Sequence, residues 1–316
     1  MGKFALTKNR IVSLAILVVI LVFLALLPTI TKGYLVTLVA DMMRYAVLTV
    51  AWVVFCAPTG YLSLATAAFY GLGFYVAAVF NGPLPFAVVI IIAGVVAFIV
   101  ALLIGLLTLR LRGVYFTIFT FAVVLLVNNV VLEVERLVTG TRGRFVETET
   151  AQTAFYAMLV VLIATLLTAV LIRRSRYGLA LQSIGEYEEA AAHSGINVVM
   201  TKVLVFATTS VFMGMAGAII ATRRTYIDPG IAFNMTTSFL PVLMAMFGGM
   251  GNLVGPVIGA AVFTYIGETL LTRFPDLYML IFGVVLILAI LFMPAGILGL
   301  GQQLWRKVKG GRRAPA

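Results

Sequence analysis

The sequence predicts an all-α fold, a polytopic transmembrane helical bundle of about 8 to 10 spans with broken helices and one large polar loop. Hydrophobic residues make up 63% of the 316 residues and charged residues only 10%, and the mean hydropathy is +1.15. A soluble globule carries far more polar surface than this. Because a spanning helix takes about 20 residues, that number of crossings fits in one transmembrane domain over residues 1–316.

Apolar runs separated by polar, Gly- or Pro-containing turns place the spans in order. The first run follows Lys3, Lys8 and Arg10, as the apolar core of a secretory signal would. The apolar run in this chain is longer than the apolar core of a signal peptide, and no convincing small-residue cleavage site follows it. We therefore expect the run to be retained as the first helix. The ten expected spans lie near residues 11–30, 34–57, 61–80, 84–107, 114–132, 154–172, 203–222, 237–247, 253–271 and 277–297.

The distribution of basic residues predicts the orientation. With both termini in the cytoplasm, 14 Lys and Arg lie on the inner side, seven lie on the outer side and Arg44 lies within a span. The polar loop 173–202 and the basic tail 302–316 would then be cytoplasmic, although Arg223 and Arg224 oppose the bias. Because the net charge of +11 is scattered over helix ends and the tail, we expect membrane lipid, and no nucleic acid, as its partner.

The loop 173–202 is the longest polar interruption in the chain. Its apolar residues recur at roughly helical spacing among acidic ones, which predicts one or two short amphipathic helices that dock onto something. The apolar positions are Leu179, Ile184, Ala190, Ala191 and Ile196, and the polar ones between them are Glu186, Glu188, Glu189 and Asn197.

Two stretches, 60–73 and 248–259, are richer in small residues than an ordinary lipid-facing helix. Small residues let helix backbones approach closely, and a break within the membrane is tolerated only where protein or water satisfies the freed backbone groups. Helix packing explains each stretch taken alone, whereas the two together favour a translocation pathway through interrupted helices. The candidate pathway residues are Ser63, Thr66, Gly71, Gly73, Gly248, Gly249 and Gly251.

Asp41 and Arg44 are the charged residues well inside an expected span, whereas Glu268 lies near the end of one, where we expect it to be solvated. Asp41 and Arg44 lie three residues apart on one helical face, where they can pair. We add both to the candidate pathway, with a purely structural ion pair as the alternative. A proton- or sodium-driven carrier normally places carboxylates near the bilayer centre, so their scarcity here argues against ion coupling.

The sequence contains almost no motif that is typical of an enzyme. One histidine excludes His-pair metal motifs, one cysteine excludes thiolate clusters, and no Gly-x4-Gly-Lys-Ser/Thr loop is present to bind ATP. We therefore expect no enzyme activity, no metal and no cofactor on this chain. If transport is driven by ATP, another chain must bind the nucleotide. That chain would act on the loop 173–202.

Four stretches resemble, in the same order, the permease subunits of branched-chain amino acid type ABC importers, the M-type partner of a permease pair. They are 60–78, 109–120, 175–221 and 248–260, the last continuing to 299. The third is the most specific, because it contains the Glu-Ala-Ala-x3-Gly signature of ABC importer permeases followed by the family's Gly-Ile-Asn. The residues of the signature stretch are Glu189, Ala190, Ala191, Gly195, Ile196 and Asn197.

The resemblance implies an ATP-driven importer that works by alternating access. In that family an extracytoplasmic solute-binding protein delivers the solute, and two ATPase subunits, which hold ATP and Mg²⁺, close and push on a coupling segment of the permease. The signature stretch would be that coupling segment. The resemblance also implies a second, related permease subunit, a bacterial or archaeal cytoplasmic membrane, and leucine, isoleucine and valine as solutes, with urea, amides and aromatic acids as alternatives.

Two other classes of function remain open. An ion-coupled secondary carrier would transport solute with this chain alone and would depend on Asp41, and a membrane scaffold would carry no flux. The few intramembrane carboxylates weigh against the carrier. The interrupted helices rich in small residues weigh against the scaffold.

Overall fold

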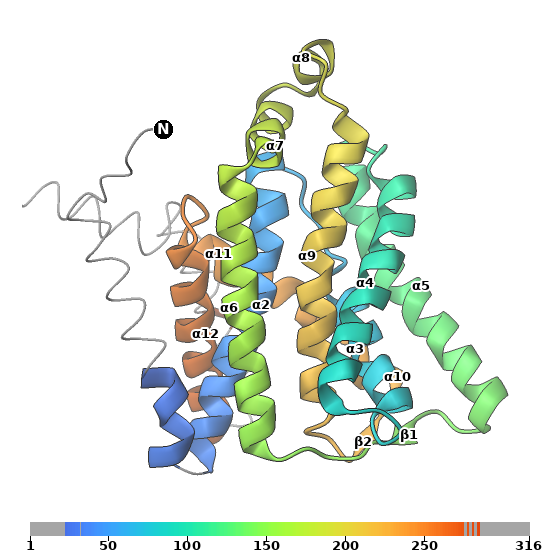
Figure 1. Ribbon diagram of the computed structural model, residues 1–316, viewed down its shortest axis with the longest axis vertical. Coiled ribbons are helices and arrows are strands. Elements are labelled where there is room, and N and C mark those ends of the chain that lie inside the picture. Colours follow the sequence, from blue (N-terminus) through green and yellow to red (C-terminus); the bar gives the residue numbers. More distant parts are fainter. Residues whose placement is uncertain (1–22, 32, 275–276, 278–279, 281–282, 285–316) are drawn as a thin grey trace, which may run out of the picture.

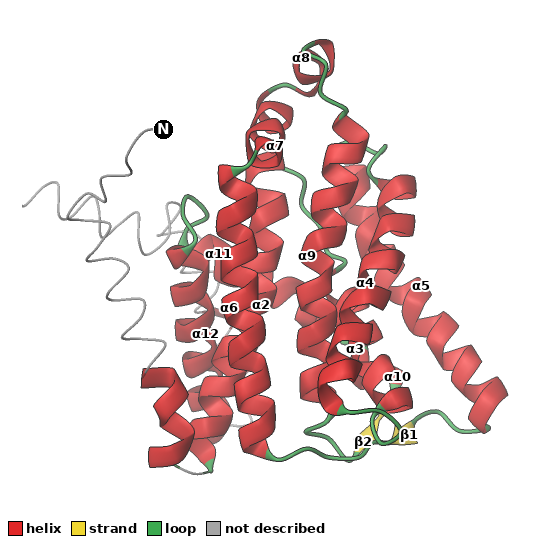
Figure 2. Ribbon diagram, viewed as in Figure 1, coloured by secondary structure: helices red, strands yellow, loops and turns green. Residues whose placement is uncertain are grey.

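The computed structural model describes residues 23–31, 33–274, 277, 280 and 283–284, and residues 23–30 are helical. The helices stand side by side, with α7 and α8 at one end of the molecule and β1, β2 and α10 at the other (Figures 1 and 2). The elements are α2 (Tyr34–Thr59), α3 (Thr66–Phe80), α4 (Phe86–Thr108), α5 (Val114–Thr139), β1 (Arg144–Phe145), α6 (Ala151–Arg174), α7 (Arg176–Glu186), α8 (Glu188–His193), α9 (Val198–Ala221), β2 (Tyr226–Ile227), α10 (Pro229–Ala232), α11 (Thr236–Gly248) and α12 (Val254–Arg273).

The prediction of an all-α polytopic bundle is confirmed. Seven described helical segments are long and apolar enough to cross a membrane, with α10 and α11 together forming one of them, and α3 is a shorter apolar helix. The two short amphipathic helices expected in the loop 173–202 are α7 and α8. Residues 11–22, most of the expected span 277–297 and the basic tail 302–316 lie outside the described residues.

One expected span is interrupted. The sequence predicts a span over 61–80, but α3 begins only at Thr66, and residues 60–65 form a non-helical linker that we call the α2–α3 break. In Figure 1 this linker runs from the α7 end of the molecule back into the middle of the bundle, where α3 starts. The α2–α3 break is therefore one of the helix breaks that the sequence predicts, and it lies within the small-residue stretch 60–73.

The helices α2 and α9 form the centre of the bundle, and α9 packs against α2, α3 and α4. Glycines allow the closest of these contacts. A Cβ placed on Gly73 of α3 would lie 1.9 Å from the carbonyl oxygen of Gly214 on α9, and one on Gly217 would lie 2.0 Å from that of Tyr70. No side chain fits at such distances, so α3 and α9 pack backbone against backbone.

A small strand pair and the short helix α10 lie at the end of the molecule opposite α8 (Figure 1). The strand β1 pairs antiparallel with β2, with Arg144 opposite Ile227. Arg144 donates hydrogen bonds of 2.8 and 3.0 Å to the two carboxylate oxygens of Glu135 on α5. Because a bidentate Arg–carboxylate pair fixes both groups, it ties the strand pair to the end of α5.

Candidate functional site

The helix α8 stands at the tip of one end of the molecule (Figure 1) and ends at a left-handed glycine. The φ of Gly195 is +84°. Its N–H donates to the carbonyl of Ala192 at 3.0 Å, and the N–H of Ile196 donates to the carbonyl of Ala191 at 3.2 Å. These are the two bonds of a Schellman motif. A Cβ on Gly195 would meet nothing within 4 Å, so glycine serves here for its backbone freedom and not for lack of space.

The other signature residues hold α8 and α9 in place or face outward. Ala191 is 3% exposed and packs in a small apolar cluster, whose other members are Ile184, Val198 and Ile196. Asn197 caps α9, because its side-chain oxygen accepts the N–H of Met200 at 3.0 Å. Ala190 is exposed, and its short side chain leaves a surface that a partner can approach closely.

Two carboxylates open α8, and both are paired. Glu188 accepts hydrogen bonds from the Tyr61 hydroxyl at 2.5 Å and from Nζ of Lys202 at 3.0 Å. Arg112 lies with Nε 3.9 Å from a Glu188 oxygen and Nη1 3.2 Å from a Glu189 oxygen. Nζ of Lys202 also lies 4.4 Å from the centre of the Tyr61 ring, which is an attractive cation–π distance. We call Tyr61, Arg112, Glu188 and Lys202 the polar joint.

Glu188 and Lys202 are absent from the site residues that the sequence predicts. The signal that could have found them is a lysine at the start of an apolar helix. The Lys202 side chain is 1% exposed, and an ammonium buried to this degree needs a carboxylate partner. The signature instead draws attention to Glu189, whose side chain is 58% exposed and contacts Arg112.

The polar joint keeps Glu188 charged. Burial alone would raise the pKa of the Glu188 carboxyl, but hydrogen bonds from Tyr61 and Lys202 and the charges of Lys202 and Arg112 outweigh it and lower the pKa below the usual 4.5. A carboxyl whose pKa is lowered by folding contributes stability above its unfolded pKa and loses it as the pH falls through the lowered value. The joint is therefore intact at neutral pH.

Hydroxyl groups hold the α2–α3 break. Three backbone N–H groups at the break and at the start of α3 donate to side-chain hydroxyls from α5, from the break itself and from α11. The pairs are Leu64 to Thr120 at 3.0 Å, Ala65 to Ser63 at 3.3 Å and Ala67 to Ser238 at 3.1 Å. Such bonds satisfy the backbone groups that a helix interruption leaves free inside a membrane protein.

Ser63 and Thr66, two candidate pathway residues, line one small cavity of about 10 Å³ between α2, α3 and α9. The Thr66 hydroxyl is buried there and has no hydrogen-bond partner among the described residues. A cavity of this size holds about one water molecule. It lies beside the break but has no room for an amino acid.

The glycines among the candidate pathway residues occupy other places. At Gly71, Gly73 and Gly248 an added Cβ would lie 1.9 to 2.3 Å from a neighbouring segment, so these three allow close packing. Gly249, with a φ of +95°, ends α11, and Gly251 is open in the turn between α11 and α12. Within the described residues, the structure does not gather the candidates into one channel.

Asp41 and Arg44 form the ion pair that their spacing predicts, with 3.2 Å between Nε and Oδ1. Nη1 of Arg44 also donates to the Tyr70 hydroxyl at 3.2 Å, and the guanidinium lies 4.2 Å from the centre of the Tyr45 ring. The two charged side chains line a cavity of about 460 Å³ between α2, α11 and α12. They lie apart from Ser63 and Thr66, which line the smaller cavity.

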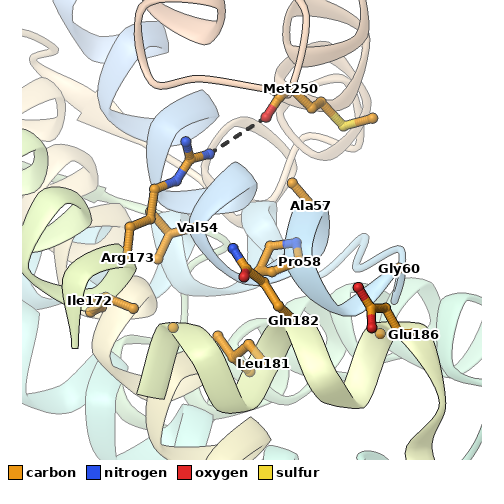
Figure 3. Close-up of a pocket in the computed structure, with 13 residues that line it drawn as sticks. Val54, Ala57, Pro58, Gly60, Ile172, Arg173, Leu181, Gln182, Glu186 and Met250 are labelled. Atoms are coloured by element: carbon orange, nitrogen blue, oxygen red, sulfur yellow. Dashed lines mark hydrogen bonds between the residues drawn. The ribbon is translucent and has the colours of Figure 1, made fainter. Parts of the chain in front are cut away.

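A hollow of about 440 Å³ lies at the α8 end, between the end of α2, α7 and the α11–α12 turn (Figure 3). Here α7 rests directly on α2, because a Cβ on Gly185 would lie 2.0 Å from the carbonyl oxygen of Pro58. Arg173, at the end of α6, reaches the carbonyl of Met250 in the turn at 3.5 Å. A partner that binds this end can therefore contact α7, α8 and the turn together.

Comparison with known proteins gives matches over most of the chain. Residues 34–290 match the family described as branched-chain amino acid transport system / permease component. The permease protein LivM of the high-affinity branched-chain amino acid transport system of Escherichia coli K12 is 26% identical, over 89% of this chain and 74% of the relative. LivM of Salmonella typhimurium is 27% identical, over 81% and 68%.

Sugar permeases match over shorter regions. The ribose import permease RbsC of Bacillus subtilis is 28% identical over 42% of this chain and 43% of the relative, and the xylose permease XylH of Haemophilus influenzae is 31% identical over 34% and 30%. No solved structure matches.

Proposed function

The chain belongs to the family of branched-chain amino acid transport permease components, and from this membership we propose that it imports leucine, isoleucine and valine with energy from partner ATPases. As a member it is the permease component of an ABC transport system and a multi-pass membrane protein. The substrate follows from the relatives that match along most of the chain, because the sugar permeases match less than half of it. A urea, amide or aromatic-acid solute would keep the mechanism and change only the cargo.

The observation that carries the proposal is α8, a short helix at the tip of one end that exposes one small side chain on each flank of its buried face. Ala190 and Ala192 are exposed, while Ala191 is buried against α7 and α9. A partner can therefore approach the α8 backbone along either flank without dislodging the inner contacts of Ala191. In our proposal α8 is the coupling helix, and two ATPase subunits holding ATP and Mg²⁺ supply the energy.

This assignment sets the orientation and the other partners. The α8 end faces the cytoplasm, together with both termini, which agrees with the excess of basic residues on that side. The end that carries β1, β2 and α10 then faces outward, where an extracytoplasmic solute-binding protein would deliver the solute. A second, related permease subunit completes the membrane part, in the cytoplasmic membrane of a bacterium or archaeon.

Docking of the ATPases on α8 can be tested with a bulky substitution on its exposed side. Ala190→Arg is expected to abolish co-purification of the ATPase subunits, because a long charged side chain would hold the two surfaces apart, while the amount of permease in the membrane stays the same. Ala151→Arg is the matched control, since Ala151 is exposed at the opposite end of the molecule. Equal ATPase recovery from Ala190→Arg and wild type would refute docking on α8.

A further inference from the structure

The polar joint connects four segments that are distant in the sequence. Glu188 belongs to α8, Lys202 to the second turn of α9, Tyr61 to the α2–α3 break and Arg112 to the linker between α4 and α5. The Tyr61 hydroxyl bonds to Glu188 across 127 positions of sequence. The coupling helix is thus hydrogen-bonded directly to an interrupted helix of the membrane part.

The buried charges of the polar joint destabilise the protein when one of their partners is missing. Lys202 is 1% exposed and Glu188 is 21% exposed, and burying charge is unfavourable unless the charge is paired and hydrogen-bonded. Replacing the pair by apolar side chains often leaves a protein equally stable. Stability alone therefore does not explain an ion pair at this place, which points to a further role.

On the far side of Tyr61, the break is held by bonds that can re-form. Its backbone groups rest on the hydroxyls of Ser63, Thr120 and Ser238, and the Thr117 hydroxyl donates to the carbonyl of Leu62 at 2.9 Å. A hydroxyl turns about its bond and accepts or donates as its surroundings change. Displacement of Tyr61 would be transmitted through these bonds to α5 and α11.

The point where α3 starts also has an unused donor and some space. The Thr66 hydroxyl is buried without a partner among the described residues, and Thr66 lines the cavity of about 10 Å³. A buried hydroxyl without a partner is unfavourable in this arrangement and gains a bond in another. Alternative hydrogen bonding at the break is therefore available once Tyr61 moves.

We propose that Tyr61 and Glu188 are positioning residues that transmit the movement of α8 to the α2–α3 break, so that ATP hydrolysis by the partners opens and closes the membrane part. The inference rests on the proposed function. The chain already connects α8 covalently to α7 and α9, and the hydrogen bond to Tyr61 adds a second connection. Inside this chain the movement is therefore transmitted by Glu188 and not by the signature carboxylate Glu189.

The test compares solute uptake with ATP hydrolysis in proteoliposomes that contain the complete transporter. Tyr61→Phe removes the hydroxyl, and with it the hydrogen bonds to Glu188 and from Lys202. It keeps the ring, whose cation–π contact with Lys202 and edge contact with Phe116 remain. We expect assembled complexes that hydrolyse ATP at close to the wild-type rate but carry at least about tenfold less leucine per ATP. Glu188→Ala removes the same bond from the other side and also leaves Lys202 without its carboxylate, so we expect the same uncoupling together with a lower stability.

Glu133→Gln is the control, because Glu133 pairs with Arg136 on an exposed part of α5 far from the joint. A wild-type ratio of leucine to ATP in Tyr61→Phe overturns the inference. Loss of assembly in both joint variants, with normal assembly of Glu133→Gln, overturns it too, because the joint would then be only structural. If wild-type protein shows no ATP-dependent uptake, the proposed function itself fails, which is a distinct outcome.

Discussion

Gly195→Val is expected to abolish ATP-driven uptake while leaving the amount of protein in the membrane unchanged. The φ of +84° at Gly195 is one that a β-branched residue cannot adopt without strain, and the left-handed conformation costs about 1–2 kcal/mol even for an ordinary L-residue. The Schellman bonds to Ala191 and Ala192 would break, and Ile196 would leave its apolar contact. The docking end of α8 would then unwind. Uptake per inserted permease in membrane vesicles measures the effect.

The control at the same position is Gly195→Asn. Asparagine enters the left-handed region more readily than other non-glycine residues, and a side chain here has open space. Gly195→Asn should therefore retain most of the uptake that Gly195→Val loses. Equal uptake by wild type and Gly195→Val would show that the geometry of the α8 end does not matter for coupling.

Gly73→Ala is expected to cause a large loss of stability for the addition of a single methyl group. The new Cβ would lie 1.9 Å from the carbonyl oxygen and 2.7 Å from the carbonyl carbon of Gly214, and backbone atoms yield only if α3 and α9 move apart. Overpacking of a core costs about 1–3 kcal/mol and sometimes more. We expect a fall of several degrees in the thermal unfolding midpoint of the purified protein in detergent.

The matched control is Gly251→Ala, where the added methyl group meets nothing within 4 Å. Its unfolding midpoint should equal that of the wild type. A Gly73→Ala protein as stable as wild type would mean that α3 and α9 are not packed backbone against backbone.

The sequence predicts those parts of the fold whose cause is local. Apolar runs place the long helices, and the spacing of Ile184 and Ala191 among acidic residues predicts α7 and α8. The start of α3 at Thr66 is not predictable in this way, because the hydroxyls that replace helical bonds at the break come from Thr120 and Ser238, 56 and 171 residues away from the groups they bind.

In the candidate site, too, residues with a local cause are predictable from the sequence and residues that depend on distant partners are not. Gly195 is predicted from the signature, and its positive φ gives a physical reason for it. Gly71, Gly73 and Gly248 fit the pathway pattern and the packing pattern equally well in the sequence, and their neighbours in the structure support packing. Glu188 is missed because its partners, Tyr61 and Lys202, lie 127 and 14 residues away, and neither spacing is a recognisable motif.

The central claim, that this permease imports branched-chain amino acids with energy from ATP, is tested most directly by uptake into proteoliposomes. The liposomes would contain the chain with its co-purifying subunits, radiolabelled leucine on one side, and ATP present or absent on the α8 side. We predict uptake that requires ATP, is competed by isoleucine and valine, and is unaffected by an ionophore. Leucine flux by this chain alone that needs no ATP and collapses with an ionophore would contradict the account.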